Sequence, residues 1–333
     1  MTKKRLLITF MLVAVCIAAA VAQTRDFVNV SGTSLENRLD EALRQGRAGG
    51  GRFWAAYSYP LRPGVVISDA RGVEGPVIER YAEVSPQDAG GARPAAGARA
   101  ALFLLYQADG GEPTLVRAEI SDASRQRASV AGGERVYWLG EAGGAESFSL
   151  LRRLIDSSDA EANAARRRED VAARLTDAVA LHEDAPAGSV TPLLEQLARG
   201  ARATGARLRA VSWLGRTPGE SSFVLGLARE EGQPREVRRL AIRTLLKSAE
   251  ASGGAAGAGV VSLRQLYDAV GDKDLKAEVI DASPKRRNKE EVTQFLRDVA
   301  RDDPDTELRE RADWRLNSKK VLGEKGAGRR RRP

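Results

Sequence analysis

The sequence predicts an α+β protein in which a small antiparallel β-sandwich or barrel-like domain precedes an α-solenoid of helical hairpins. Two observations predict this order. Residues 53–59 follow a period of two, as in a strand with one buried face, whereas residues 191–317 repeat one helix-turn-helix pattern four times. A chain of 333 residues also exceeds the usual size of one domain, so at least two domains are expected.

The first 22 residues have the features of a secretory signal peptide. Three cations at residues 3–5 precede an apolar run that ends at residue 21, and Ala-Val-Ala before Gln23 provides a small-x-small cleavage site. The only cysteine, Cys16, lies inside this run. We therefore expect an exported chain, periplasmic or secreted, with no transmembrane segment. A mature chain without cysteine excludes disulfides, thiol catalysis and cysteine-ligated zinc.

Residues 23–145 contain the elements of the β-rich domain. A short strand at residues 27–30 precedes a helix that is capped by Thr33 or Ser34 and ends near Gly46. Asp-Gly-Gly-Glu at residues 109–112 predicts a hairpin turn, and residues 85–97, rich in Pro, Gly and Ala, predict a loop. Strands are expected at residues 53–59, 64–68, 77–84, 101–107, 114–120 and 136–139. Short strands at this spacing indicate an antiparallel sandwich or open barrel.

Six aromatic residues of this domain allow two interpretations. If they are exposed, their rings can stack on sugars. If they alternate within a pleated sheet, they form its core, which we expect because one face of the sheet must be buried. These residues are Trp54, Tyr57, Tyr59, Tyr81, Tyr137 and Trp138.

From residue 146 the apolar residues recur with the helical period. Residues 147–155 and 159–182 predict two helices, and we expect residues 146–185 to form an atypical capping unit for the solenoid. His182, the only histidine, lies at the end of the second helix. We expect it to be solvated at the negative pole of the helix dipole. The sequence has no Gly-x-Ser-x-Gly elbow for a catalytic triad, and one His-Glu pair is too few for a di-iron site.

The repeats of residues 186–318 align on a small residue in the second helix of each hairpin. An apolar residue stands four positions before it, which places both residues on one helical face. A cation stands three positions before it in every repeat. In chain order the small residues are Ala210, Ala241, Val279 and Ala312, the apolar residues are Ala206, Val237, Leu275 and Leu308, and the cations are Arg207, Arg238, Lys276 and Arg309.

The sequence Asp-Pro-Asp-Thr-Glu-Leu-Arg-Glu-Arg-Ala at residues 303–312 contains an Asp-Pro start, an aliphatic-Arg pair and a small residue. In these features the region resembles the HEAT-repeat family, in the short bacterial form of the phycobilisome-lyase-like repeats. The β-rich region carries no such resemblance. The third repeat departs from the pattern, since Ser283-Pro284 shortens its second helix. Together with the predicted signal peptide and the lack of catalytic and metal-binding motifs, the resemblance leads us to expect a non-catalytic exported scaffold that binds a protein partner, with no cofactor or metal.

The basic column of Arg207, Arg238, Lys276 and Arg309 also allows two interpretations. It can form a positive stripe that binds an acidic partner. Alternatively, each cation can pair with an acid of its own or the next repeat, because an acidic column stands two positions before it in three of the four repeats, and such pairs would fix the stacking of the repeats. That acidic column consists of Glu236, Asp274 and Glu307.

Residues 319–333 are expected to form a disordered basic tail with seven cations and one Glu, whereas residues 23–318 carry a formal charge of about −1. The tail ends in four arginines, Arg329, Arg330, Arg331 and Arg332. Together with exposed aromatics it would support an alternative function, an envelope-associated binder of anionic cell-wall or outer-membrane material. The neutral body disfavours nucleic acid as a partner. An enzyme would require two carboxylates facing a cleft in the β domain, as in glycan cleavage.

Overall fold

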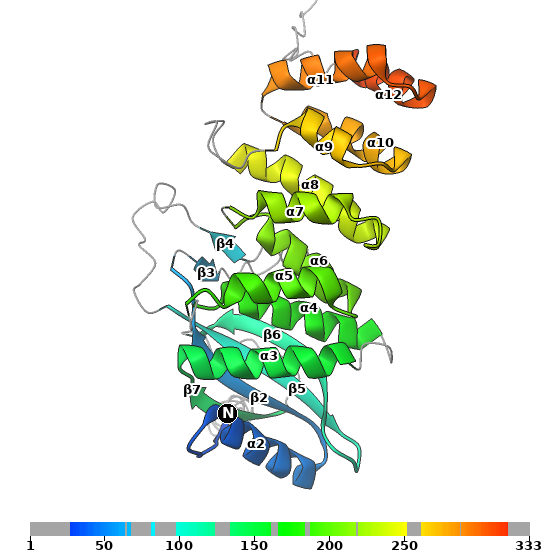
Figure 1. Cartoon of the computed structure of the whole chain (residues 1–333). Helices are drawn as coiled ribbons and strands as arrows, with labels where there is room; N and C mark the ends of the chain where they lie inside the picture. Colours follow the sequence, from blue (N-terminus) through cyan, green and yellow to red (C-terminus); the bar gives the residue numbers. More distant parts are fainter. Residues whose placement is uncertain are drawn as a thin grey trace, which may run out of the picture. The chain divides into compact units, whose positions relative to one another are not determined.

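A computed structural model describes residues 27–63, 65–67, 81–83, 98–123, 134–160, 166–183, 187–217, 219–251, 261–286 and 288–318 (Figure 1). The chain divides into two compact units, Met1–Gly188 and Ser189–Pro333. A sheet in the first unit is followed by helices, which confirms the predicted order of strands and helices. The predicted signal peptide, the loop at residues 85–97 and the basic tail lie outside the described residues.

The first unit contains one five-stranded sheet with the strand order β1-β7-β2-β5-β6. Strand β7 runs parallel to both of its neighbours, whereas β5 runs antiparallel to β2 and β6. Two further strands form a separate antiparallel pair. The strands are β1 Phe27–Asn29, β2 Gly51–Pro60, β3 Val65–Ile67, β4 Tyr81–Glu83, β5 Arg99–Ala108, β6 Thr114–Asp122 and β7 Arg135–Glu141.

The predicted antiparallel sandwich or barrel is therefore wrong for the described residues, because their main sheet is open and mixes parallel with antiparallel pairs. Helix α2 (Leu35–Gly49) connects β1 to β2, so these strands run in the same direction, and β7 lies between them. Connections of this kind produce parallel strands. The helix itself was predicted, and Ser34 caps it by accepting a hydrogen bond from the amide of Asn37. The predicted hairpin joins β5 and β6, with Gly110 at a φ of 78°.

Both faces of strand β2 are buried. On one face, Phe53 packs so closely on Gly46 of α2 that a β-carbon there would lie 2.3 Å from the ring. On the other face, Trp54 packs edge-on against Phe103 with ring centroids 6.4 Å apart. The interpretation of the aromatics as core is confirmed for Trp54, Tyr57, Tyr59 and Tyr137, each at most 2% exposed. Trp138 is half-buried, and the side chain of Tyr81 lies outside the description.

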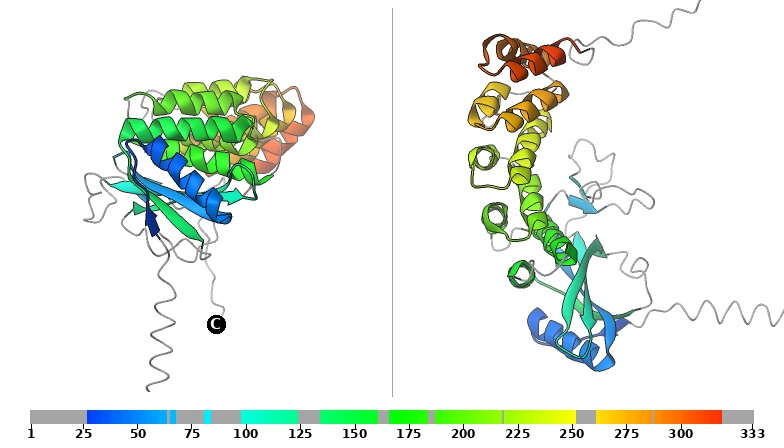
Figure 2. Two further views of the ribbon diagram at one scale, coloured as in Figure 1. Left: turned by 90° about the horizontal axis from the view of Figure 1, so that it is seen from below. Right: turned by 90° about the vertical axis from the view of Figure 1, so that its right-hand side faces the viewer.

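Two helices of the predicted capping unit belong to the compact unit of the sheet. Helix α3 (Gly144–Ala160) packs against β2, α2 and α4, and α4 (Arg166–Leu181) lies along β6. Helices α2 and α3 lie on the same side of the sheet (Figure 2). The sequence assigned residues 146–185 to the repeats because their period is helical, but periodicity does not show which surface buries the apolar face.

The second unit consists of four helical hairpins in succession. The second helices contact one another in the order α6, α8, α10, α12, and the first helices contact one another in the order α7, α9, α11. Their bounds are α5 Val190–Gly200, α6 Thr204–Leu214, α7 Ser221–Arg229, α8 Arg235–Ala251, α9 Leu263–Ala269, α10 Lys273–Ala282, α11 Lys289–Asp302 and α12 Thr306–Leu316.

The predicted repeat alignment corresponds to buried positions. The four aligned small residues are 0% exposed, and the apolar residues four positions before them are at most 3% exposed. Helix α10 ends at Ala282 and a 3₁₀ turn, Ser283–Lys285, follows it, so Ser-Pro shortens this helix as predicted. Among the helices of the described ranges, none is both long and apolar enough to cross a lipid bilayer.

Candidate functional site

His182 is fully buried, and the prediction that it is solvated is wrong. A bridge pairs it with Leu61, and the amide of Glu183 donates to the carbonyl of Pro60, so the chain after α4 joins the end of strand β2. The imidazole ring stacks on Tyr59 with centroids 5.3 Å apart and an interplanar angle of 7°. A histidine at a helix end is solvated only when no neighbouring element covers that end.

The two nitrogens of His182 have different partners. Nδ1 lies against the backbone carbonyl of Glu183, which only accepts, so Nδ1 carries the proton of the neutral ring. Nε2 then accepts a hydrogen bond from the hydroxyl of Ser147 at the start of α3. A serine and a histidine in this contact can form a nucleophile and base. Here both residues are 0% exposed, so the contact lies in the core where β2, α3 and α4 meet.

The basic column makes the same type of contact in three of the four repeats. Arg207 donates to the carbonyl of Ala201 from Nε at 3.0 Å and from Nη2 at 2.6 Å. Arg238 donates from Nε to the carbonyl of Ala228 at 3.1 Å, and Arg309 donates from Nη1 to the carbonyl of Asp303 at 2.7 Å. In each case the acceptor lies at the C-terminal end of the first helix of the same hairpin, where carbonyls lack helical partners.

The third repeat has a lysine in this column. The ammonium of Lys276 lies 5.0 Å from the centroid of the Tyr267 ring in the preceding helix, a cation–π contact. The interpretation that these cations pair with the acidic column therefore requires correction, whereas their binding to an acidic partner stays a prediction. The three arginines are directed at backbone carbonyls of their own hairpin, and among the described residues they form no ion pair with the acidic column.

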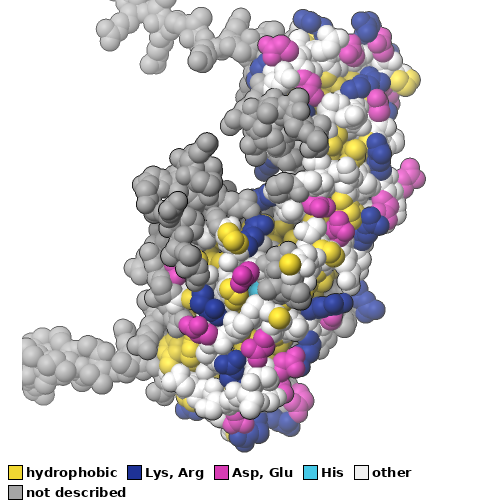
Figure 3. All heavy atoms as spheres, turned by 60° about the vertical axis from the view of Figure 1, so that its left-hand side comes forward, with side chains coloured by type: hydrophobic (Ala, Val, Ile, Leu, Met, Phe, Trp, Pro, Cys, Tyr) yellow, Lys and Arg dark blue, Asp and Glu magenta, His cyan; other side chains and the backbone are white. Residues whose placement is uncertain are grey.

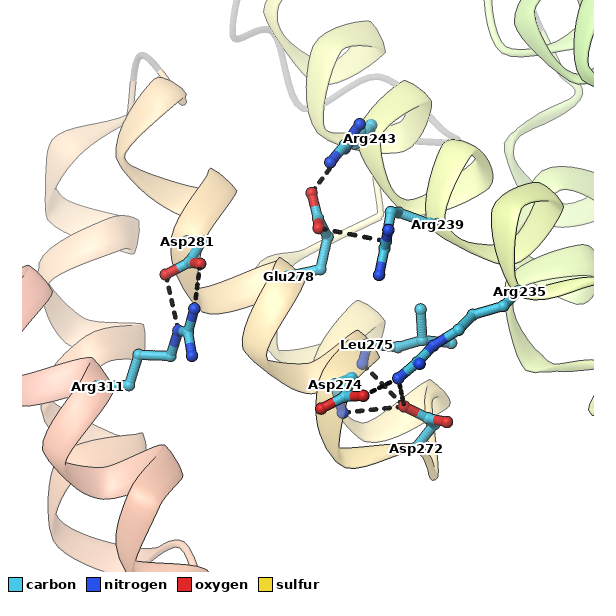
Figure 4. Close-up of polar contacts among 9 residues, drawn as sticks. All are labelled: Arg235, Arg239, Arg243, Asp272, Asp274, Leu275, Glu278, Asp281 and Arg311. Carbon is cyan, nitrogen blue, oxygen red and sulfur yellow. Dashed lines mark hydrogen bonds and ion pairs between the residues drawn. The ribbon is translucent and has the colours of Figure 1, made fainter.

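Two of the three acids of that column, Asp274 and Glu307, pair with a different set of cations, which the sequence analysis missed. Arg235 at the start of α8 pairs with Asp274 and lies 3.5 Å from Asp272, which precedes α10 (Figure 4). One repeat later, Lys273 lies 2.7 Å from Glu307 and 2.9 Å from Asp305, which precedes α12. Each of these two acids therefore pairs with the first cation of the preceding second helix.

Two further groups of ion pairs join the same helices. Glu278 of α10 lies 3.6 Å from Arg239 and 2.6 Å from Arg243 of α8 (Figure 4). Asp281 of α10 lies 2.7 Å from Arg311 and 3.1 Å from Arg315 of α12. We call these contacts between α8, α10 and α12 the ion-pair ladder. The i, i+4 spacing of cations in residues 235–243 was the signal in the sequence that could have predicted it.

The ladder shifts the pKa of several of its groups. Burial opposes ionisation of Asp281, but its hydrogen bonds to Arg311 and Arg315 outweigh burial and lower its pKa. Hydrogen bonds to Glu307 and Asp305 raise the pKa of Lys273, and the bond to Glu278 raises the pKa of Arg243. All these groups are therefore charged near neutral pH. Most are partly or fully exposed, so solvent screening keeps the contribution of each pair to stability small.

Asp272 and Asp305 also cap the helices that they precede. Asp272 accepts hydrogen bonds from the amides of Asp274 and Leu275, and Asp305 accepts from those of Glu307 and Leu308. Each cap thus ties the start of a second helix to a cation of the preceding repeat. Cations and acids are interspersed over the described part of the face in Figure 3. Arg329, Arg330, Arg331 and Arg332 lie outside the described residues.

Comparisons of the chain with models of protein families, with curated proteins and with solved structures found no match.

Proposed function

We propose that the protein is a non-catalytic exported scaffold in which residues 189–318 form a HEAT-like α-solenoid that binds a protein partner. The observation that carries the proposal is the contact that recurs in the repeats, an arginine of the second helix bonded to the end of the first helix. The second helices α6, α8, α10 and α12 also contact one another in chain order. Repeats that are built alike and stacked in order present equivalent positions along one extended surface. Proteins and peptides are the usual partners of such surfaces.

The alternative, a binder of anionic envelope material, depends on the Arg-rich tail and on aromatics of the β-rich unit. Four of these six aromatics are buried in the sheet core, which leaves the tail, the half-buried Trp138 and the undescribed side chain of Tyr81 as the basis for that function. Neither interpretation uses the buried Ser147 and His182 in catalysis.

Affinity capture distinguishes the two functions. Residues 23–333 and a matched chain ending at residue 318 would be immobilised and exposed to lysate and envelope fractions of the source organism at moderate salt. We expect both chains to retain the same protein partner. If the chain ending at residue 318 loses all binding, or if only anionic polymer is recovered, the scaffold function is contradicted. Binding to anionic polymer is electrostatic, so it should also weaken as salt is added.

A variant of the repeat core locates the binding unit. Val279 is 0% exposed in α10, and Val279→Asp places an unpaired charge in the repeats. We expect this variant to lose helical circular dichroism and the partner while the sheet unit keeps its structure. The control is Ser222→Asp on the exposed side of α7. Capture that survives Val279→Asp would place binding outside the repeats.

A further inference from the structure

Each second helix contacts the second helix of the next repeat through the same few positions. We number these positions from the aligned small residue of each helix. The residue at position +2 contacts the residue at position −1 of the next second helix. Arg243 contacts Glu278 in this way at 2.6 Å, and Asp281 contacts Arg311 at 2.7 Å. Position −2 also faces the next helix, since Arg239 lies 3.6 Å from Glu278.

Helix α12 presents the same positions, but the described residues that follow it, 317–318, form no further helix. Trp314 occupies position +2 and is 63% exposed, the one large hydrophobic side chain of the described ranges that is exposed. Glu310 occupies position −2, and Asp313 occupies position +1. Position +1 is aliphatic and 0% exposed in the preceding repeats, at Val211, Ile242 and Ile280. On α12, an acid, Asp313, therefore stands where the preceding repeats have a buried aliphatic residue. A tryptophan, Trp314, stands where α8 and α10 have a residue that forms an ion pair.

The ring of Trp314 is held in place from one side. The guanidinium of Arg315 lies 4.7 Å from the ring centroid, and Nε of Arg315 donates to Asp281 of α10 at 3.1 Å. A ring fixed in this way loses little conformational entropy when a partner covers it, and tryptophan is strongly enriched among the residues that dominate binding energy.

Two acids beside this ring lack an ion-pair partner among the described residues. Glu310 and Asp313 are both exposed, and neither forms an ion pair with any residue in the described part of the chain. A second copy of this face would bring like charges together, which opposes association. A cationic partner would complement them.

We propose that the outer face of α12, formed by Glu310, Asp313 and Trp314, docks an amphipathic helix of a partner protein. Apolar residues of that helix cover Trp314, and its Lys or Arg residues pair with Glu310 and Asp313. A helix is the element that the equivalent face receives in the preceding repeats. This site rests on the proposed scaffold function: it specifies where the protein partner binds and which residues of the partner make the contact.

The test uses two stapled helical peptides as probes, since unstapled helices of about 15 residues are marginally stable in water. The peptides share one apolar stripe and differ in their charged residues, Lys and Arg in one and Glu in the other. Binding to residues 23–333 is measured by fluorescence anisotropy of the labelled peptide. We expect the basic peptide to bind at least roughly ten-fold more tightly than the acidic one. Trp314→Ala should weaken the basic peptide roughly ten-fold or more.

A charge reversal tests the second element of the site. Glu310→Lys should weaken the basic peptide and strengthen the acidic one, whereas the control Glu290→Lys, an exposed acid of α11, should change neither. The site is overturned if the basic peptide fails to bind, or if Trp314→Ala and Glu310→Lys leave both affinities unchanged. Capture of the natural partner by the Trp314→Ala chain would reject this site alone, whereas absence of any captured protein would reject the scaffold function.

Discussion

Arg207 donates two hydrogen bonds, from Nε at 3.0 Å and from Nη2 at 2.6 Å, to the backbone carbonyl of Ala201. This contact closes the first hairpin, because Ala201 follows the last residue of α5 and Arg207 lies in α6. The positive charge of the guanidinium also faces the negative pole of α5.

Removal of this contact should weaken the repeats. We expect Arg207→Met, which retains the aliphatic stem, to lower the free energy of unfolding by about 1–2 kcal/mol, because the carbonyl of Ala201 loses a charged donor. Urea unfolding followed by helical circular dichroism measures the change. Arg202→Met, at an exposed position of the same turn, is the control and should stay within about 0.5 kcal/mol. Equal effects of the two substitutions would argue against the contact.

A buried ion pair joins the third and fourth hairpins. Arg286, 3% exposed, lies 3.2 Å from both carboxylate oxygens of Glu291 and donates to the carbonyl of Val261 at 2.6 Å. Glu291 also accepts from the amide of Leu263 at 2.8 Å. We expect Glu291→Gln to destabilise the repeats by about 2–3 kcal/mol, because it leaves a buried guanidinium without its counter-charge.

Hydrogen exchange provides a local measurement of the same change. The amide of Leu263 should exchange faster in Glu291→Gln, whereas Glu290→Gln, an exposed neighbour on α11, should leave it unchanged. Unaltered protection of Leu263 in both variants would show that Glu291 does not hold the start of α9.

Because His182 is the only histidine of the chain, its two ring nitrogens can be assigned directly by NMR. We expect nitrogen-15 NMR near neutral pH to show His182 as a neutral ring protonated at Nδ1, because that atom faces the carbonyl of Glu183. Ser147→Ala should shift the Nε2 resonance and destabilise the sheet unit by about 1–3 kcal/mol, since a buried acceptor loses its donor. A ring protonated at Nε2 would contradict this assignment of the hydrogen bonds.

The ladder should make stability depend on pH in the acid range. The pKa of Asp281 is lowered in the folded state from its ordinary value of 3.8. Its contribution is therefore complete well above pH 3.8 and is lost as the pH falls through the lower folded value. At pH 7, Asp281→Asn should be less stable by about 1 kcal/mol or less. The difference between the two proteins should disappear in strong acid and shrink with added salt; a difference that is independent of pH would exclude the ion pairs as its cause.

The repeats could be predicted from the sequence because their pattern is local. Residues four positions apart on one helix share a face, so the buried positions of α6, α8, α10 and α12 follow from spacing alone. The same holds for the early end of α10 at Ser283-Pro284 and for the hairpin turn near Gly110. The candidate residues Arg207, Arg238, Lys276 and Arg309 were located correctly as a column, but their partners were not predicted.

Those partners depend on distance in space, which spacing along one helix does not determine. The ladder between α8 and α10 and the insertion of β7 between β1 and β2 join residues far apart in sequence. The contact of Arg207 with Ala201 spans only six residues, but it depends on how α5 and α6 meet across their turn. The burial of His182 could not be predicted for the same reason. The sequence shows that it lies at the end of a helix, but whether that end is solvated depends on the elements that pack on it. The sequence by itself determined the helices, most strands and the repeat register, because these follow from local periodicity. Only the tertiary structure decided the sheet topology and the polar partners, because burial and pairing are set by elements that meet after the chain folds.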